Sequence, residues 1–128
     1  MERIKKTKMV LLVCFVSTIG WTQSQIDLIG NWQNEERPDM VTEFYLAKDG
    51  LVYGKRKESN KDLKNEEHIF IKKLKYSSDT KTFMGTMTPP DKDILLNVVI
   101  SFENKDRIKM VARKLLMSKT IYFKRIKQ

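Results

Sequence analysis

The side chains best suited to bind a small molecule are three tyrosines and two cations. They are Tyr45, Tyr53, Lys55, Tyr76 and Arg113. Aromatic rings beside one or two cations suit an amphipathic or carboxylated ligand. We expect these residues to line the mouth of a barrel. The alternative is that the tyrosines occupy ordinary strand positions, where this residue type is common.

Catalytic and metal-binding patterns do not stand out. His68 is the single histidine, so a histidine-based site lacks a second member, and the adjacent Glu66 and Glu67 do not have ligand spacing. No nucleophile–base pair and no pair of carboxylates is apparent. Asp62 and Asn65 are typical turn residues, because their short side chains bond to the local backbone. We therefore predict a protein that is not an enzyme and that uses no cofactor and no metal.

The first 24 residues have the features of a secretory signal peptide. Basic residues are followed by an apolar run over 9–16 and then by a small, polar exit, which is the order of such a signal. The run is shorter than the about 20 apolar residues that span a membrane. Thr22 and Ser24 fit a cleavage before Gln25, and an uncut N-terminal anchor is the alternative. We expect residues 25–128 to form one exported domain, in the periplasm or outside the cell.

The single cysteine, Cys14, lies inside this apolar run. The processed chain would therefore have no cysteine, and it would form no disulfide and no reactive thiolate. A domain of roughly 100 residues can be stabilised by its core alone, although with modest stability.

The charge of the chain is uneven. Removal of residues 1–24 leaves 21 basic and 15 acidic side chains, a formal charge of +6. Residues 25–67 carry −3 and residues 68–128 carry +9. A basic half on an exported protein indicates an anionic partner, such as an envelope surface or an acidic protein, and export disfavours nucleic acid. The alternative is that the lysines keep the strands soluble and their edges unpaired.

The pattern of apolar residues and turns after residue 25 predicts an all-β fold. The expected strands begin with 28–32 and continue with 40–47, 51–55, 69–76, 82–88, 94–102, 106–114 and 120–125. Asp49-Gly50 is a strong hairpin signal, and 94–102 has the clearest period-2 pattern of the chain, which predicts a strand with Ile94, Val98 and Phe102 among the residues of one face. A meander of this kind must hide its edges. We predict an antiparallel eight-stranded up-and-down barrel, and we expect a monomer.

The first and last strands carry residues that would close the barrel. Alternation places Ile121, Phe123 and Arg125 on one inward face. A buried arginine needs a partner, and an indole ring is a suitable one. Trp32 on the first strand is the expected partner, and Gly30 leaves room for a close approach. We expect these three residues, Gly30, Trp32 and Arg125, to be structural.

Gly30-x-Trp32 on the first strand, with a basic residue on the last, resembles the lipocalin and wider calycin pattern. Over most of the processed chain the sequence is also similar to a group of small exported bacterial proteins of unknown function with lipocalin-like barrels. Further residues of that resemblance are Asp49-Gly50, Tyr53-Gly54-Lys55, Asp62 and Asn65. A lysine-rich strand in the middle departs from it, and the long helix of true lipocalins is not seen. The resemblance implies an eight-stranded barrel with a ligand cup, and it implies no activity.

The size of the interior decides between two functions. Eight strands enclose either packed side chains or one small ligand, and large residues such as Phe44, Phe83, Phe102, Met110 and Phe123 favour a filled interior. The first hypothesis is a binding protein for a small amphipathic or apolar ligand. The second is a protein with a packed core that docks its basic C-terminal strands on an anionic surface or an acidic protein.

Overall fold

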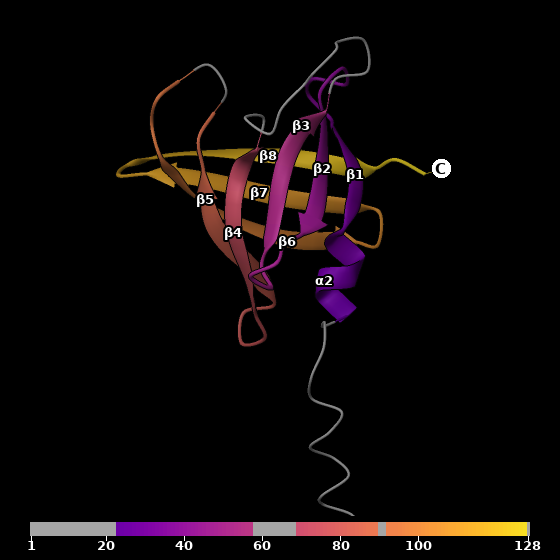
Figure 1. The fold of residues 1–128 in the computed structure, drawn as a ribbon. Helices are drawn as coiled ribbons and strands as arrows, with labels where there is room; N and C mark the ends of the chain where they lie inside the picture. The colour runs from indigo at the N-terminus through magenta and orange to yellow at the C-terminus, as the bar shows by residue number, and fades with distance from the viewer. Residues whose placement is uncertain (1–22, 58–68, 90–91, 128) are drawn as a thin grey trace, which may run out of the picture.

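The computed structural model describes residues 23–57, 69–89 and 92–127, and these form a closed antiparallel barrel after a short helix (Figure 1). Each strand pairs with the next along the chain, and the last strand pairs with the first. The elements are α2 (Gln23–Leu28), β1 (Gly30–Asn34), β2 (Val41–Leu46), β3 (Val52–Lys57), β4 (Ile69–Ser77), β5 (Thr82–Met87), β6 (Leu96–Asn104), β7 (Arg107–Lys114) and β8 (Met117–Arg125). The predicted eight-stranded up-and-down barrel is confirmed.

The barrel forms because apolar side chains alternate along its strands and face inward together. In β7, Ile108, Met110 and Ala112 are buried. In β6, Val98 and Ile100 are buried at positions of the same alternation. Fourteen apolar residues of the described chain make this core, with Trp32, Phe44 and Phe83 among its largest. Burial of these side chains is the main favourable term that holds the barrel together.

Several element boundaries differ from the sequence prediction; for example, the strand expected over 94–102 is β6, Leu96–Asn104, so Ile94 and Leu95 precede it. Leu28 was expected to open the first strand, but it is the last residue of α2, and β1 begins at Gly30. The last strand was expected to begin at residue 120, but β8 begins at Met117, directly after a tight turn at Leu115 and Leu116. The helix is too short to show a helical repeat in the sequence, and the leucine turn lacks the residue types that normally mark a hairpin.

A bulge interrupts the pairing of β4 with β5. The register shifts between Lys72 and Lys75, and Lys73 has a positive φ of 58°. Gly85 of β5 lies against this bulge, because a Cβ atom at that position would come within 2.6 Å of the Lys72 carbonyl oxygen. The absence of a side chain at Gly85 therefore lets the bulged backbone approach β5 closely.

The two ends of the barrel are built differently. Helix α2 lies at one end, with the β2–β3, β4–β5 and β6–β7 turns (Figure 1). The Gln25 side-chain amide donates to the Gly50 carbonyl in the β2–β3 turn, at 3.1 Å. The β1–β2, β5–β6 and β7–β8 connections lie at the opposite end, because successive connections of an up-and-down barrel alternate between its ends.

Candidate functional site

The end of the barrel that carries α2 is closed by packing and hydrogen bonds. Leu28 of α2 is fully buried, and the Trp32 indole nitrogen donates to its carbonyl oxygen at 2.9 Å. The Trp32 ring also lies 6.4 Å from the Phe102 ring in a tilted arrangement. This hydrogen bond satisfies the one polar atom of a buried indole, so the helix seals this end of the barrel.

Arg125 joins the first and last strands at the closed end. Its guanidinium carbon lies 4.3 Å from the centroid of the Trp32 ring, and the two residues are direct cross-strand neighbours. One Nη donates to the carbonyl oxygens of Asp27, at 2.7 Å, and Lys105, at 3.0 Å, and Nε lies 3.3 Å from an Asp106 carboxylate oxygen. The predicted contact of tryptophan with arginine is present.

Gly30 lies at the start of β1, next to this arginine. It has a φ of +134°, a backbone conformation that other residues rarely adopt, and a Cβ atom there would lie 3.8 Å from an Arg125 Nη. The glycine is required by its φ angle, whereas 3.8 Å is an ordinary contact distance, so Arg125 alone would tolerate a side chain there. Gly30, Trp32 and Arg125 therefore lie together as a closure of the barrel, at the end opposite the open mouth.

Three of the five residues predicted to line a barrel mouth lie together on the outer surface. The Tyr45 and Tyr53 rings stack at 6.1 Å, and the Lys55 ammonium lies 5.5 Å from the centroid of the Tyr45 ring. Lys55 also lies 3.9 Å from Glu43. They face outward because Phe44 and Gly54, which alternate with them along β2 and β3, face the core.

The Tyr53 hydroxyl is held by the adjacent turn. It donates to an Asp49 carboxylate oxygen at 2.6 Å, and this hydrogen bond raises the pKa of Tyr53 and lowers the pKa of Asp49. Asp49 also accepts a hydrogen bond from the Leu51 amide at 3.0 Å. The tyrosine thus braces the predicted Asp49-Gly50 hairpin from outside the barrel.

The other two predicted residues, Tyr76 and Arg113, lie apart from these three and from each other. Tyr76 packs on Phe83 with ring centroids 5.0 Å apart, at the edge of the core. Arg113 is exposed and lies opposite Asn97 and Ser118 in the ladders. The expectation of a single mouth lined by all five residues is therefore corrected: alternation places most of them outside the barrel.

The open end contains a cavity with apolar walls. It has a volume of about 410 Å³ and reaches inward to Thr42, Met110 and Phe123. Further side chains complete the wall, namely Phe70, Met87, Leu96, Ala112 and Ile121. We call this cavity the cup. Its volume lies within the range of small-molecule sites, about 300–1,000 Å³, so the interior is packed toward the closed end and hollow toward the open end.

The rim of the cup is mainly basic. Arg37, Lys92, Lys114 and Lys119 border it, together with one acidic residue, Glu36. Glu36 lies 3.9 Å from Lys119, so part of the charge is balanced. The arrangement favours an anionic group at the mouth and an apolar group below it.

The wall of the cup uses residues that the sequence assigned only to the core. The inward position of Met110 and Ala112 is predictable from the alternation of β7, and that of Leu96 from the alternation of β6. Alternation does not predict how much space remains between inward side chains. Thr42 is the buried polar residue of the described chain, and it lines the cup. A polar residue at an inward position of β2 is the one signal that could have indicated the cup.

The described residues contain no group of three or more histidine, cysteine, aspartate or glutamate side chains that could hold a metal ion. Within the same residues, no helix is long and apolar enough to cross a membrane. His68, Asp62 and Asn65 lie outside the described residues, as do residues 1–22 of the predicted signal peptide 1–24, whose last two residues are the first two of α2. The site therefore rests on the cup and its rim.

Comparison with known proteins gives no match: no protein-family model, no curated protein and no solved structure is significantly similar to this chain.

Proposed function

We propose that this protein is an exported, lipocalin-like binding protein that holds one small amphipathic ligand in the cup. The ligand's apolar part would lie against Phe70, Met110 and Phe123, and its anionic group would lie at the rim. The proposal assigns binding by a monomer, with no catalytic step, no metal and no cofactor. The observation that carries it is the cavity of about 410 Å³, which has apolar walls and a basic rim.

The apolar wall and the basic rim of the cup would contribute to ligand binding in different ways. Transfer of apolar surface from water to the wall is worth roughly 25 cal/mol per Å², and a cup formed before binding avoids part of the ordering cost. Methionine side chains such as Met87 and Met110 adapt to the shape of an apolar group. Four basic residues against one acidic residue at the rim select for negative charge on the exposed part of the ligand.

The family and the location are supported by different parts of the chain. The closed up-and-down barrel, with Trp32 on β1 stacked on Arg125 of β8, supports the lipocalin-like group of small exported bacterial proteins. The basic start and the apolar run over 9–16 support export. Cleavage before Gln25 would leave the helix contacts that seal the barrel, which begin at Gln25 with its hydrogen bond to Gly50.

A substitution that fills the cup provides the test. Ala112 lines the cup and is nearly fully buried, so Ala112→Phe would place a ring in the space for the ligand. The probe is a fluorescent fatty acid, titrated into the exported chain. We expect Ala112→Phe to weaken its binding by about tenfold or more, because a filled volume excludes the apolar group.

The matched control is Val111→Phe, one residue away on the outer face of β7. It should bind the fatty acid as the original chain does. Far-ultraviolet circular dichroism and thermal unfolding of both variants show whether overpacking, which costs about 1–3 kcal/mol, has unfolded the barrel. Equal binding by folded Ala112→Phe and the original chain would refute the cup.

The second candidate function is docking through the basic outer face of the C-terminal strands. Lys109, Arg113 and Lys124 lie on the outward positions of β7 and β8. Contacts between such exposed charges and an anionic partner are strongly screened by salt. Binding that collapses at high ionic strength and in the triple alanine variant would favour this function, whereas fatty-acid binding that persists would favour the cup.

A further inference from the structure

The β7–β8 turn exposes three consecutive apolar residues. Leu115 is 93% exposed, Leu116 is fully exposed and Met117 is 76% exposed. Large apolar side chains that are exposed together, and not scattered singly, indicate a site of interaction. We call Leu115, Leu116 and Met117 the apolar tip.

The backbone of the apolar tip is unfavourable for its sequence. Leu115 has a φ of 56°, in the left-handed region, and it stands with Leu116 between the paired residues Lys114 and Met117. Two-residue hairpin turns favour asparagine and glycine, because these residues adopt positive φ at low cost. The two leucines therefore destabilise this turn in two ways, through the strained backbone of Leu115 and through exposed apolar surface. The stability of the fold gives no reason for leucine at these positions.

A second apolar connection lies at the same end of the barrel. In the β5–β6 connection, Leu95 is 58% exposed and Ile94 is 39% exposed. Ile94 and Met117 both border the cup, so the two connections flank one side of its mouth. In Figure 1 both extend beyond the barrel on the side away from the C-terminus.

The described residues in these two connections and in the strand ends beside them are also mainly basic. Lys92, Arg113, Lys114 and Lys119 stand against Asp93. Glu36, which lies 3.9 Å from Lys119, belongs to the β1–β2 connection. Apolar side chains ringed by lysine and arginine match the interface of an anionic bilayer, where acyl chains lie beneath phosphates. An acidic protein would use the charges, but it would not require leucines at the outermost point.

We propose that the apolar tip and Leu95 insert into the interface of an anionic lipid bilayer, with Lys92, Arg113 and Lys114 against the lipid phosphates. The cup would then open toward the membrane, so that an amphipathic ligand could pass between bilayer and cup without crossing water. This last step rests on the proposed function, whereas docking on the bilayer does not.

Within this turn Leu115 has a positive φ and Leu116 does not, and such a turn prefers glycine at its first central position. The decisive variant is therefore Leu115→Gly combined with Leu116→Asn. It installs the preferred residues of a hairpin turn, so the thermal midpoint should stay the same or rise. Binding to vesicles of phosphatidylcholine and phosphatidylglycerol, measured by co-sedimentation, should weaken by about tenfold or more, because two leucines no longer leave water. A structural role for the leucines would give the opposite pattern, with lost stability and unchanged binding.

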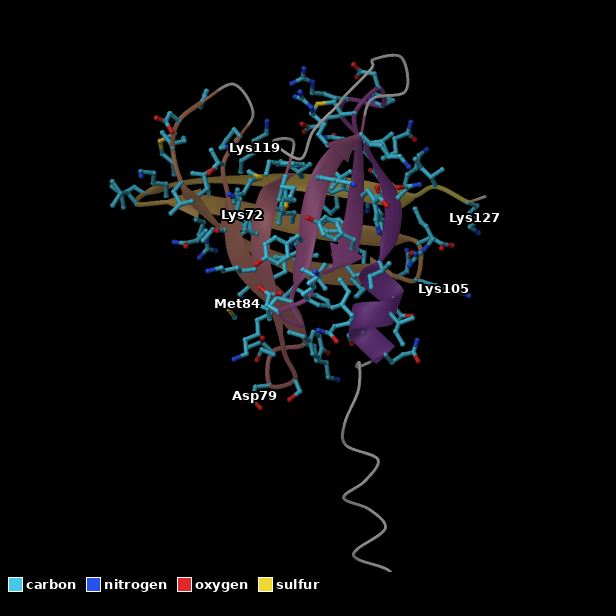
Figure 2. All side chains as sticks on the ribbon, in the orientation of Figure 1. Lys72, Asp79, Met84, Lys105, Lys119 and Lys127 are labelled. Atoms are coloured by element: carbon cyan, nitrogen blue, oxygen red, sulfur yellow. The ribbon has the colours of Figure 1, made fainter. Side chains whose placement is uncertain are left out.

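Two controls separate the apolar and the charged contributions. Met84→Ser removes an exposed methionine of β5 that lies away from Lys119 (Figure 2), and it should leave vesicle binding unchanged. Lys92→Gln with Lys114→Gln should weaken binding to the anionic vesicles and reduce its dependence on salt. A tryptophan at the tip, Leu116→Trp, should shift its fluorescence to shorter wavelength when anionic vesicles are added.

Three results would overturn the proposal. The first is an exported chain that does not bind anionic vesicles. The second is binding that is equal for the Leu115→Gly, Leu116→Asn variant and the original chain. The third is a dimer in sedimentation velocity that the same variant dissolves, because this would assign the tip to self-association. Fatty-acid binding to the cup is measured without vesicles, so a failure of docking and a failure of the cup are distinguishable.

Discussion

Arg125 contacts an aromatic ring, two backbone carbonyls and a carboxylate at once. These contacts depend on a planar guanidinium, which stacks on a ring and donates from a rigid fork of N–H groups, whereas an ammonium is a compact point charge that cannot stack while donating to such widely spaced acceptors. We predict that Arg125→Lys lowers the free energy of unfolding by about 2 kcal/mol. Urea denaturation measures it, with Lys124→Arg on the outer surface as the control, and an unchanged midpoint for Arg125→Lys would contradict the closure.

Away from the barrel closure, Glu35 and Arg107 form a close ion pair. Arg107 donates to both carboxylate oxygens, at 2.9 and 3.0 Å, and its guanidinium lies 4.1 Å from the Tyr122 ring centroid. The hydrogen bond from Arg107 lowers the pKa of Glu35 below its ordinary value of 4.5. The pair joins the end of β1 to β7, which are not neighbours in the sheet.

This pKa shift predicts a dependence of stability on pH. Because the pKa of Glu35 is lower in the folded state, the stabilisation is present above about 4.5 and is lost as the pH falls through the folded value. Glu35→Gln should therefore lower the thermal midpoint at neutral pH by a small amount, since the pair is exposed. The two midpoints should converge in acid, and a difference that grows in acid would contradict this account.

At the scale of single residues, the sequence predicts contacts that depend on alternation alone. Trp32 and Arg125 follow from the inward positions of the first and last strands. Tyr45, Tyr53 and Lys55 lie together, as expected of a cluster of aromatic rings and a cation, but they lie outside the barrel. The residue types indicated a binding site. The alternation of inward and outward positions along each strand, however, decides whether a side chain lies inside or outside the barrel.

The bulge in β4 is the element whose geometry depends most on one small residue. A Cβ atom at Gly85 would lie 2.6 Å from the Lys72 carbonyl oxygen and 3.0 Å from that of Lys73. Because those atoms belong to backbone, they cannot turn away as a side chain would. We predict that Gly85→Ala lowers the free energy of unfolding by about 1–3 kcal/mol, measured by urea denaturation. Met84→Ala, at the adjacent exposed position, should change it by about 0.5 kcal/mol or less; equal stabilities for the two variants would contradict the close approach.

At the scale of elements, the sequence predicts strands better than what lies between them. The segments 94–102 and 106–114 have a clear period-2 pattern, so the existence of β6 and β7 and their inward faces are predictable, although β6 begins only at Leu96. Helix α2 has six residues, too few for a helical repeat to be recognised in the sequence, and the burial of Leu28 packs it on the barrel. The turn at Leu115 and Leu116 lacks turn residues, and this is why its strand was predicted to begin later.

The whole molecule has one sealed and one open end. Closure of eight strands could be predicted, because a meander must hide its edges, and the first and last strands are then neighbours. The cup could not be predicted from the sequence, because its volume depends on how far Phe70, Met110 and Phe123 fill the space near the mouth. Large aromatic residues favoured a filled interior, and the structure concentrates several of them, Trp32 and Phe102 among them, near the closed end.

The most direct measurement of the central claim is native mass spectrometry of the chain exported by its own host. The account predicts a bound small molecule with the original chain and with Val111→Phe, lost on denaturation and absent from Ala112→Phe. The bound mass would identify the ligand, and the protein mass would give the N-terminus. A clean mass without ligand, repeated after incubation with lipid extracts, would contradict the cup.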